Sequence, residues 1–297
     1  MTSRRGFLKT GALALGGMAL NCIAHGVEPV KRTGKSVVKV GCCAYSYRKY
    51  LTGENPTMTL ETFLETAAEI GCDGAEITSY YFPTEFTVEY VNKLKRQACL
   101  LGLDISSTAV GNRFTFPEGA ERDAQLALVK KWIVHAAELG APCMRVFAGA
   151  APKGSSEQEA IKWVVDCLGE CAELASQHGV MLALENHGGV TATADQVLSI
   201  ISSVKSDWVG LNLDTGNFHT EDPYADIAKV APYAVITHFK SEVSPLGKPK
   251  EKADVKKIAG ILKASGYRGY LNLEYEGAED PKTAVPKLIQ SMKEGVG

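Results

Sequence analysis

The chain has 297 residues, of which 45% are hydrophobic and 22% are charged, a composition typical of a globular protein with one large domain or two small ones. Its 32 basic and 34 acidic side chains give a formal net charge of −2, which does not steer a protein toward a polyanion such as nucleic acid. The eight cysteines are scattered through the chain without a CxxC pair. We therefore expect neither a zinc knuckle nor a required disulfide.

The first thirty residues differ in character from the rest. Ser3-Arg4-Arg5-Gly6-Phe7-Leu8-Lys9 precedes an apolar run that is too short to span a bilayer. This segment resembles a twin-arginine export signal, and a frayed basic terminus is the alternative. The resemblance implies export to the periplasm by the twin-arginine machinery, with residues 1–30 as signal and linker. Cys22 is a weak candidate for lipid anchoring because Asn21 before it is unlike the small residue that such a site requires, so we expect a soluble periplasmic product.

Beyond residue 35, short β-branched runs alternate with longer segments of helical period, which indicates βα units on a parallel sheet. The predicted strands cover residues 37–44, 74–78, 104–110, 143–148, 181–184, 209–213, 234–238 and 270–273. The predicted helices begin near Thr59, Thr87, Glu121, Ser155, Thr193, Pro223, Asp254 and Pro281, several of which are good N-cap residues. Eight units in about 260 residues predict a single-domain α/β fold, a (β/α)₈ TIM barrel over residues 36–297.

An open, nucleotide-binding doubly wound sheet is the alternative fold. It would carry a phosphate loop after its first strand. The sequence has neither GxGxxG at that position nor a Walker lysine loop, which favours the barrel. In a TIM barrel the active site lies where the strands end and the next loops begin, so polar residues at strand ends are the candidates for chemistry.

Ionisable side chains stand at the ends of the last four predicted strands, at Glu185, Asp214, His238 and Glu274. Three carboxylates that converge on one barrel mouth would repel one another and raise their own pKa values, and a divalent cation removes that cost. Three carboxylates and one imidazole suit a fairly hard ion such as Mn²⁺, Mg²⁺ or Co²⁺, and Zn²⁺ is also compatible. The sequence therefore predicts one divalent metal ion at the mouth.

This set, with steps of 29, 24 and 36 residues, resembles the metal site of the xylose isomerase-like TIM-barrel superfamily, over roughly residues 36–296. Members include ketose 3-epimerases, inosose dehydratases, hydroxypyruvate isomerase and the apurinic-site endonucleases of AP endonuclease family 2 type. The resemblance implies that Glu185, Asp214, His238 and Glu274 bind the metal. It also implies that Glu185 and Glu274 exchange protons with the two faces of a sugar, as catalytic acid and base.

One position departs from the superfamily pattern. Members commonly carry Asp-x-x-His after strand six, whereas this chain has Asn217 there and His219 two residues later. An amide can hydrogen-bond a substrate oxygen but is a poor metal ligand or proton carrier, which argues against a second metal. The chain also has only six histidines, too few for the multi-metal endonuclease branch.

Five further residues near the strand ends are candidate substrate-binding residues: Arg145, His187, Asn217, Lys240 and Glu276. Two of them have alternative roles, because Arg145 can form an ion pair that organises the mouth and His187 can orient Glu185. Glu76 is either a structural partner for Arg145 or a catalyst. Aromatic residues in the first two loops are candidates for stacking on a sugar, or for plain packing: Tyr45, Tyr47, Tyr80, Tyr81 and Phe82.

A metal that polarises a carbonyl makes the neighbouring C–H acidic, and a nearby carboxylate can then remove the proton to form an enediolate. We therefore expect a metal-dependent isomerase or epimerase of an unphosphorylated sugar, since no phosphate cradle is visible. One alternative is a keto-sugar lyase or dehydratase, for example one that eliminates from a 3-keto-glycoside. The other is a periplasmic sugar-binding barrel without catalysis. The expected partner is a small sugar or keto-sugar, and a homo-oligomer is compatible with the sequence.

Overall fold

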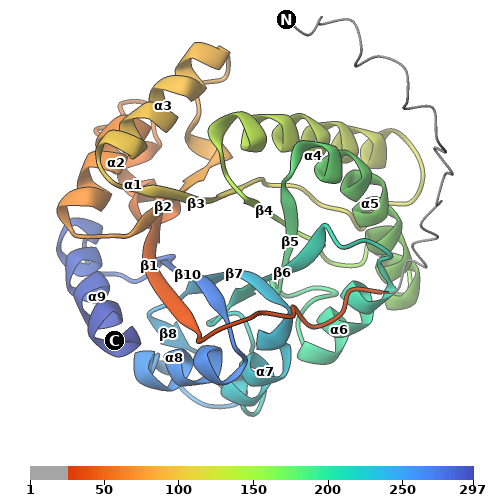
Figure 1. Ribbon diagram of the computed structural model, residues 1–297. Helices are drawn as coiled ribbons and strands as arrows, with labels where there is room; N and C mark the ends of the chain where they lie inside the picture. Colours follow the sequence, from red (N-terminus) through yellow and green to blue (C-terminus); the bar gives the residue numbers. More distant parts are fainter. Residues whose placement is uncertain (1–25) are drawn as a thin grey trace, which may run out of the picture.

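The computed structural model describes residues 26–297, so the predicted export motif and Cys22 lie outside the described residues. Eight parallel strands close into one barrel in the order β1-β10-β7-β6-β5-β4-β3-β2, and a ring of helices surrounds it (Figure 1). The predicted single-domain (β/α)₈ barrel is confirmed. Its strands are β1 (Val37–Cys43), β2 (Gly74–Thr78), β3 (Asp104–Ala109), β4 (Cys143–Val146), β5 (Met181–Glu185), β6 (Val209–Asp214), β7 (Ala234–Phe239) and β10 (Arg268–Leu273).

The eight predicted helices begin within two residues of the predicted positions, and all of them except the helix that begins at Ala120 have a side-chain cap that satisfies a first-turn N–H group. Thr59, Ser156 and Thr193 each form a capping box. The helices are α1 (Arg48–Leu51), α2 (Leu60–Glu69), α3 (Val88–Leu100), α4 (Ala120–Leu139), α5 (Glu157–His178), α6 (Ala194–Ser203), α7 (Pro223–Val230), α8 (Val255–Ala264) and α9 (Pro281–Val296). None of these helices combines the length and apolar character needed to cross a membrane.

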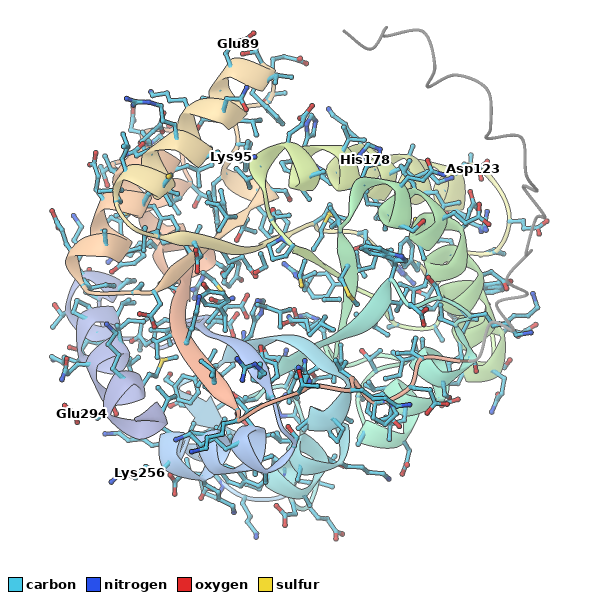
Figure 2. All side chains as sticks on the ribbon, viewed as in Figure 1. Glu89, Lys95, Asp123, His178, Lys256 and Glu294 are labelled. Atoms are coloured by element: carbon cyan, nitrogen blue, oxygen red, sulfur yellow. The ribbon has the colours of Figure 1, made fainter. Side chains whose placement is uncertain are left out.

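The strands are covered on both faces, by the barrel interior and by the helices. All five residues of β2 and all six of β6 are buried, as expected for a parallel sheet between two layers. Charged side chains lie on the outer ring of helices, for example Glu89 on α3, Asp123 on α4 and Lys256 on α8 (Figure 2). The polar residues inside the barrel therefore stand apart from the general surface charge.

Pairing of β1 with β10 closes the barrel, with six residues of each strand in register. Ser46, in the 3₁₀ turn Ala44–Tyr47 after β1, strengthens this closure. Its buried Oγ donates to the Leu273 carbonyl at 2.8 Å and accepts from the Tyr275 N–H at 2.9 Å. These two bonds flank Glu274 and fix the backbone that carries it.

Residues 26–36 run along the opposite end of the barrel, past the first residues of β7 and β10 (Figure 1). The Val27 N–H donates to the Ile201 carbonyl at 3.2 Å, and the Val30 N–H donates to the Pro232 carbonyl at 2.9 Å. Arg32 donates to the Ala234 carbonyl at 2.6 Å. Part of the segment expected to be a linker is thus bound to the barrel.

The connection between β7 and α8 contains an antiparallel hairpin that the sequence pattern did not predict. Its strands, β8 (Glu242–Val243) and β9 (Glu251–Lys252), have two residues each. Such short strands give no periodic signal to read. The hairpin follows β7 directly and therefore contributes to the wall of the barrel mouth beside His238 and Lys240.

Candidate metal centre at the barrel mouth

Four side chains from neighbouring strands meet at the carboxyl end of the barrel. Glu185 ends β5, Asp214 ends β6, His238 lies near the end of β7, and Glu274 directly follows β10. Each offers one ligand atom, and these atoms all lie within 4.8 Å of one another. The four residues are only 0–6% exposed. The structure thus brings together the four residues that the sequence placed at successive strand ends.

The donor set fits a divalent cation. The Asp214 Oδ1 accepts a hydrogen bond from the Gly216 N–H at 2.8 Å, but Oδ2 is buried and has no hydrogen-bond partner within residues 26–297. Burial raises the pKa of Asp214 to about 7. Burial also raises the pKa of Glu185, with Arg145 opposing the shift and Glu274 adding to it. A divalent cation among these oxygens would supply the charge that the buried carboxylates lack.

Glu76, the middle residue of β2, orients the imidazole of His238. Its Oε2 lies 2.8 Å from the His238 Nε2 and accepts a second hydrogen bond from the Ser107 hydroxyl at 2.7 Å. Burial opposes ionisation of Glu76, but His238 and Arg145 outweigh it and lower the pKa of Glu76. A carboxylate acceptor holds the proton on Nε2 and leaves Nδ1 facing Glu185 and Glu274, at 3.6 and 3.7 Å. This is the carboxylate–histidine arrangement that supports metal ligands.

The role of Glu76 differs from both sequence-based alternatives. Within the described residues Arg145 forms no hydrogen bond or ion pair with Glu76, whose direct partners are His238 and Ser107. The His238 contact joins residues 162 positions apart, so no local pattern could have indicated it. Glu76 therefore supports the centre through its contact with His238.

Three side chains hold Glu185. The Arg145 Nε lies 3.4 Å from its Oε2, the Asn212 amide donates to Oε2 at 2.9 Å, and the Asn217 amide donates to Oε1 at 3.2 Å. Arg145 is itself buried, with its guanidinium 3.8 Å from the centroid of the Phe147 ring. The structure therefore shows the ion pair that was one of the two roles considered for Arg145. The Asn217 amide is hydrogen-bonded to Glu185 in the structure, and the contact of Asn217 with substrate stays a prediction.

Lys240 holds Glu274 on the other side of the cluster. The Lys240 Nζ lies 2.6 Å from the Glu274 Oε2, 2.6 Å from the Glu276 Oε2 and 3.7 Å from the Asp214 Oδ2. Burial opposes ionisation of Glu274, but His238 and then Lys240 lower its pKa to about 2. The two candidate proton carriers thus have opposite pKa shifts, upward for Glu185 and downward for Glu274, the pattern by which active sites separate an acid from a base.

A polar pocket of about 150 Å³ opens beside Lys240 and is called here the mouth pocket. It is lined by Gly216, Asn217, His219, Lys240, Ser241, Glu242, Ser244, Lys250, Glu276 and Gly277. Its lining offers hydrogen-bond donors and acceptors and contains both lysine and glutamate side chains. Such a lining suits a neutral, polyhydroxylated ligand. Three of the five predicted substrate-binding residues therefore share one pocket next to the four candidate ligands.

His187 is not one of the four residues of the cluster. The residue is exposed, its ring packs against Phe147 with centroids 4.4 Å apart, and its backbone N–H donates to the Thr191 hydroxyl. No hydrogen bond joins His187 to Glu185 in the part of the chain that the structure describes. The orienting role considered for His187 belongs instead to Asn212 and Asn217.

Two asparagines that were not among the predicted site residues support the ligands. Asn186 donates to the Asp214 carbonyl at 2.9 Å and accepts from the Asp214 N–H at 2.8 Å, which ties the ends of β5 and β6 together. The Asn212 amide nitrogen lies 3.1 Å from the His238 Nδ1 as well as donating to Glu185. Strand alternation places Asn212 on the same side as Asp214, and this signal could have identified it.

The aromatic residues of the first two loops divide between packing and the mouth. Tyr47 is fully buried against Phe63, and Phe82 packs against Phe86 and Trp132. The Tyr80 hydroxyl accepts a hydrogen bond from Arg145 at 3.1 Å. The rings of Tyr45 and Tyr81 are partly buried, and the Arg48 guanidinium lies over the Tyr45 ring, 4.8 Å from its centroid.

Gly188 and Gly189 turn the chain after β5, and both have positive φ, 65° and 54°. A Cβ on Gly189 would lie 2.3 Å from the Gly149 carbonyl oxygen, whereas a Cβ on Gly188 would meet nothing within 4 Å. Gly189 therefore lies close to the loop after β4. The Gly149 carbonyl in that loop also accepts a hydrogen bond from the Val190 N–H. The close packing of these two loops therefore requires glycine at position 189.

We predict that Gly189→Ala destabilises the protein more than Gly188→Ala does. Both substitutions place alanine in the left-handed region, at a cost of about 1–2 kcal/mol, and only Gly189→Ala adds an overlap with backbone. Denaturant unfolding of the two variants measures the difference. Equal losses of stability would show that the contact between the loops after β4 and β5 is not tight.

Glu76→Gln is predicted to weaken divalent-cation binding by about 10–100-fold, because the partner of a ligating imidazole sets its orientation and basicity. Titration calorimetry with Mn²⁺ measures the affinity. Glu61→Gln, at a surface ion pair with Lys93, is the matched control and should bind as the wild type does. Unchanged affinity in Glu76→Gln would rule out this supporting role.

Comparison with known proteins agrees with this fold. A family described as "Xylose isomerase-like TIM barrel" matches residues 64–295. None of the curated proteins matches the sequence. Solved structures share the fold at low identity. D-psicose 3-epimerase from Clostridium cellulolyticum H10, in a structure with D-tagatose, is 17% identical over 87% of this chain and 98% of its own, with a TM-score of 0.71.

Two further structures are similar. The 3-keto-D-glucoside 4-epimerase of E. coli is 18% identical over 87% of this chain and all of its own, with a TM-score of 0.70. The IOLI protein, in a structure with a bound zinc atom, is 20% identical over 87% of this chain and 96% of its own, with a TM-score of 0.66. The family match covers most of the barrel, including all four strand-end residues of the cluster. The chain therefore belongs to the xylose isomerase-like TIM-barrel family.

Proposed function

We propose that the protein is a divalent-metal-dependent sugar isomerase or epimerase. It would act by removing a proton next to a carbonyl, through an enediolate. Support comes from the similar structures, two of which are named as sugar epimerases, and from the buried cluster at the barrel mouth. The proposed metal ligands are Glu185, Asp214, His238 and Glu274. Mn²⁺, Mg²⁺ or Co²⁺ is preferred on the chemistry of the donors, and Zn²⁺ is compatible.

The observation that carries the proposal is the pair of carboxylates around His238. Glu185 and Glu274 lie at similar distances from the His238 Nδ1, 3.6 and 3.7 Å, and each has its own cationic partner, Arg145 or Lys240. A reaction that removes a proton from one face of a carbon and returns it to the other needs two proton carriers.

A divalent cation held by this set would withdraw electrons from a substrate carbonyl and stabilise negative charge on its oxygen. One glutamate takes the proton from the adjacent carbon, and the electron pair of the broken C–H bond moves toward the carbonyl oxygen to give the enediolate. The other glutamate, in its protonated form, then delivers a proton to the opposite face of that carbon. Arg145 stabilises Glu185 as a carboxylate.

The mouth pocket would hold the part of the sugar away from the reacting carbons. Asn217, Lys240 and Glu276 line it and offer donors and an acceptor for hydroxyl groups. His187 and Arg145 complete the proposed substrate contacts from β5 and β4. Burial of the four candidate ligands keeps bulk water from the proton carriers, which protects an enediolate from side reactions.

The test is solvent exchange followed by NMR. The metal-loaded protein is incubated in D₂O with a panel of ketoses and 3-keto-glycosides. Deuterium at a carbon beside the carbonyl, together with an altered sugar, is the expected result. Release of water or an aglycone would assign a lyase, and binding without exchange would assign a sugar-binding protein.

Glu274→Gln is predicted to lower the exchange rate by about 10²–10⁴-fold, the usual contribution of a general acid or base. The matched control is Glu279→Gln, since Glu279 lies in the same loop on an exposed ion pair with Lys287. This control should exchange at the wild-type rate. Full exchange in Glu274→Gln would remove that residue from the proposed mechanism.

A further inference from the structure

Lys240 makes contacts that a bound divalent cation would also require. Its Nζ lies 2.6 Å from the Glu274 Oε2 and 3.7 Å from the Asp214 Oδ2, and both carboxylates belong to the candidate ligand set. It is the only lysine within 4.0 Å of these two carboxylates among the described residues. Its side chain is 10% exposed. An ammonium so close to two ligand carboxylates would repel a cation on the same oxygens.

We propose that Lys240 is a built-in counter-ion that exchanges places with the metal. Without a cation, its ammonium neutralises Glu274 and Asp214. When a divalent cation binds, the ammonium withdraws from these carboxylates and keeps only Glu276 as its partner. The inference rests on the proposed metal centre and assigns a positioning role to Lys240 and Glu276 within it.

The stem of Lys240 is fixed, so only its outer part can move. A Cβ on Gly216 would lie 2.4 and 2.5 Å from the Lys240 Cβ and Cγ, which shows how tightly the stem packs on that glycine. The Lys240 N–H also donates to the Thr215 hydroxyl at 3.2 Å. Rotation about the last bonds of the four-carbon stem is therefore the motion that the packing allows.

Glu276 is placed to receive the displaced ammonium. It already lies 2.6 Å from the Lys240 Nζ, and its side chain is 44% exposed, against 8% for Glu274. Both Lys240 and Glu276 line the mouth pocket. Movement toward Glu276 thus takes the ammonium away from the buried ligands to a position that solvent and substrate can reach, where desolvation costs less.

The test is a double-mutant cycle on metal affinity, with Lys240→Met, Glu276→Gln and the double variant titrated with Mn²⁺ by calorimetry. Met keeps most of the volume of the stem. Lys240→Met should bind Mn²⁺ at least about tenfold more tightly, because the competing charge is gone, and Glu276→Gln about tenfold more weakly, because the displaced ammonium has no partner. The double variant should bind like Lys240→Met. Lys229→Met, at a surface ion pair with Asp195, is the matched control and should leave the affinity unchanged.

Each other outcome contradicts a distinct part of the account. Weaker or unchanged binding by Lys240→Met overturns the exchange. An equal effect of Glu276→Gln in the presence and absence of Lys240 shows that Glu276 acts on the metal directly, which also overturns it. Failure of the wild type to bind any divalent cation contradicts the proposed function itself. Should Lys240→Met not fold, wild-type affinity in Glu276→Gln would still refute the proposal, and a Mn²⁺-induced rise in Tm gives a second readout of affinity.

Discussion

The structure depends on the electrostatics of three carboxylates buried together at one end of a barrel. Glu185, Asp214 and Glu274 lie around His238 with 0–6% exposure, where like charges cannot be left uncompensated. Arg145 and Lys240 supply positive charge from two sides, and the Asp214 Oδ2 is left without a hydrogen bond in the described chain. The buried carboxylates therefore need one more positive charge, which a divalent cation would supply.

The surrounding polar residues act through orientation. Glu76 fixes the imidazole of His238, Asn212 donates to Glu185, and Asn186 holds the backbone of Asp214. Ser46 does the same for the backbone on either side of Glu274. These contacts bring strands from opposite sides of the barrel into one hydrogen-bonded network, which is how a site gains rigidity from its support. The barrel therefore presents the ligands in a preformed arrangement.

The fold was readable from the sequence because its strands are short apolar runs and its helices begin at capping residues such as Thr59 and Thr193. The four strand-end residues were readable because parallel strands in a barrel end at one mouth. The residues that support these four could not be predicted from the sequence. The contact of Glu76 with His238 spans 162 positions, and the contact of Lys240 with Glu274 depends on how the Lys240 stem packs over Gly216. The hairpin of β8 and β9 escaped because two-residue strands carry no period.

The most direct test of the central claim is a crystal structure of the protein grown or soaked with Mn²⁺, examined for anomalous scattering. The account predicts one anomalous peak among Glu185, Asp214, His238 and Glu274, with the His238 Nδ1 as the nitrogen ligand and the Lys240 ammonium turned toward Glu276. A peak elsewhere, or none at a Mn²⁺ concentration that saturates binding in solution, would contradict it.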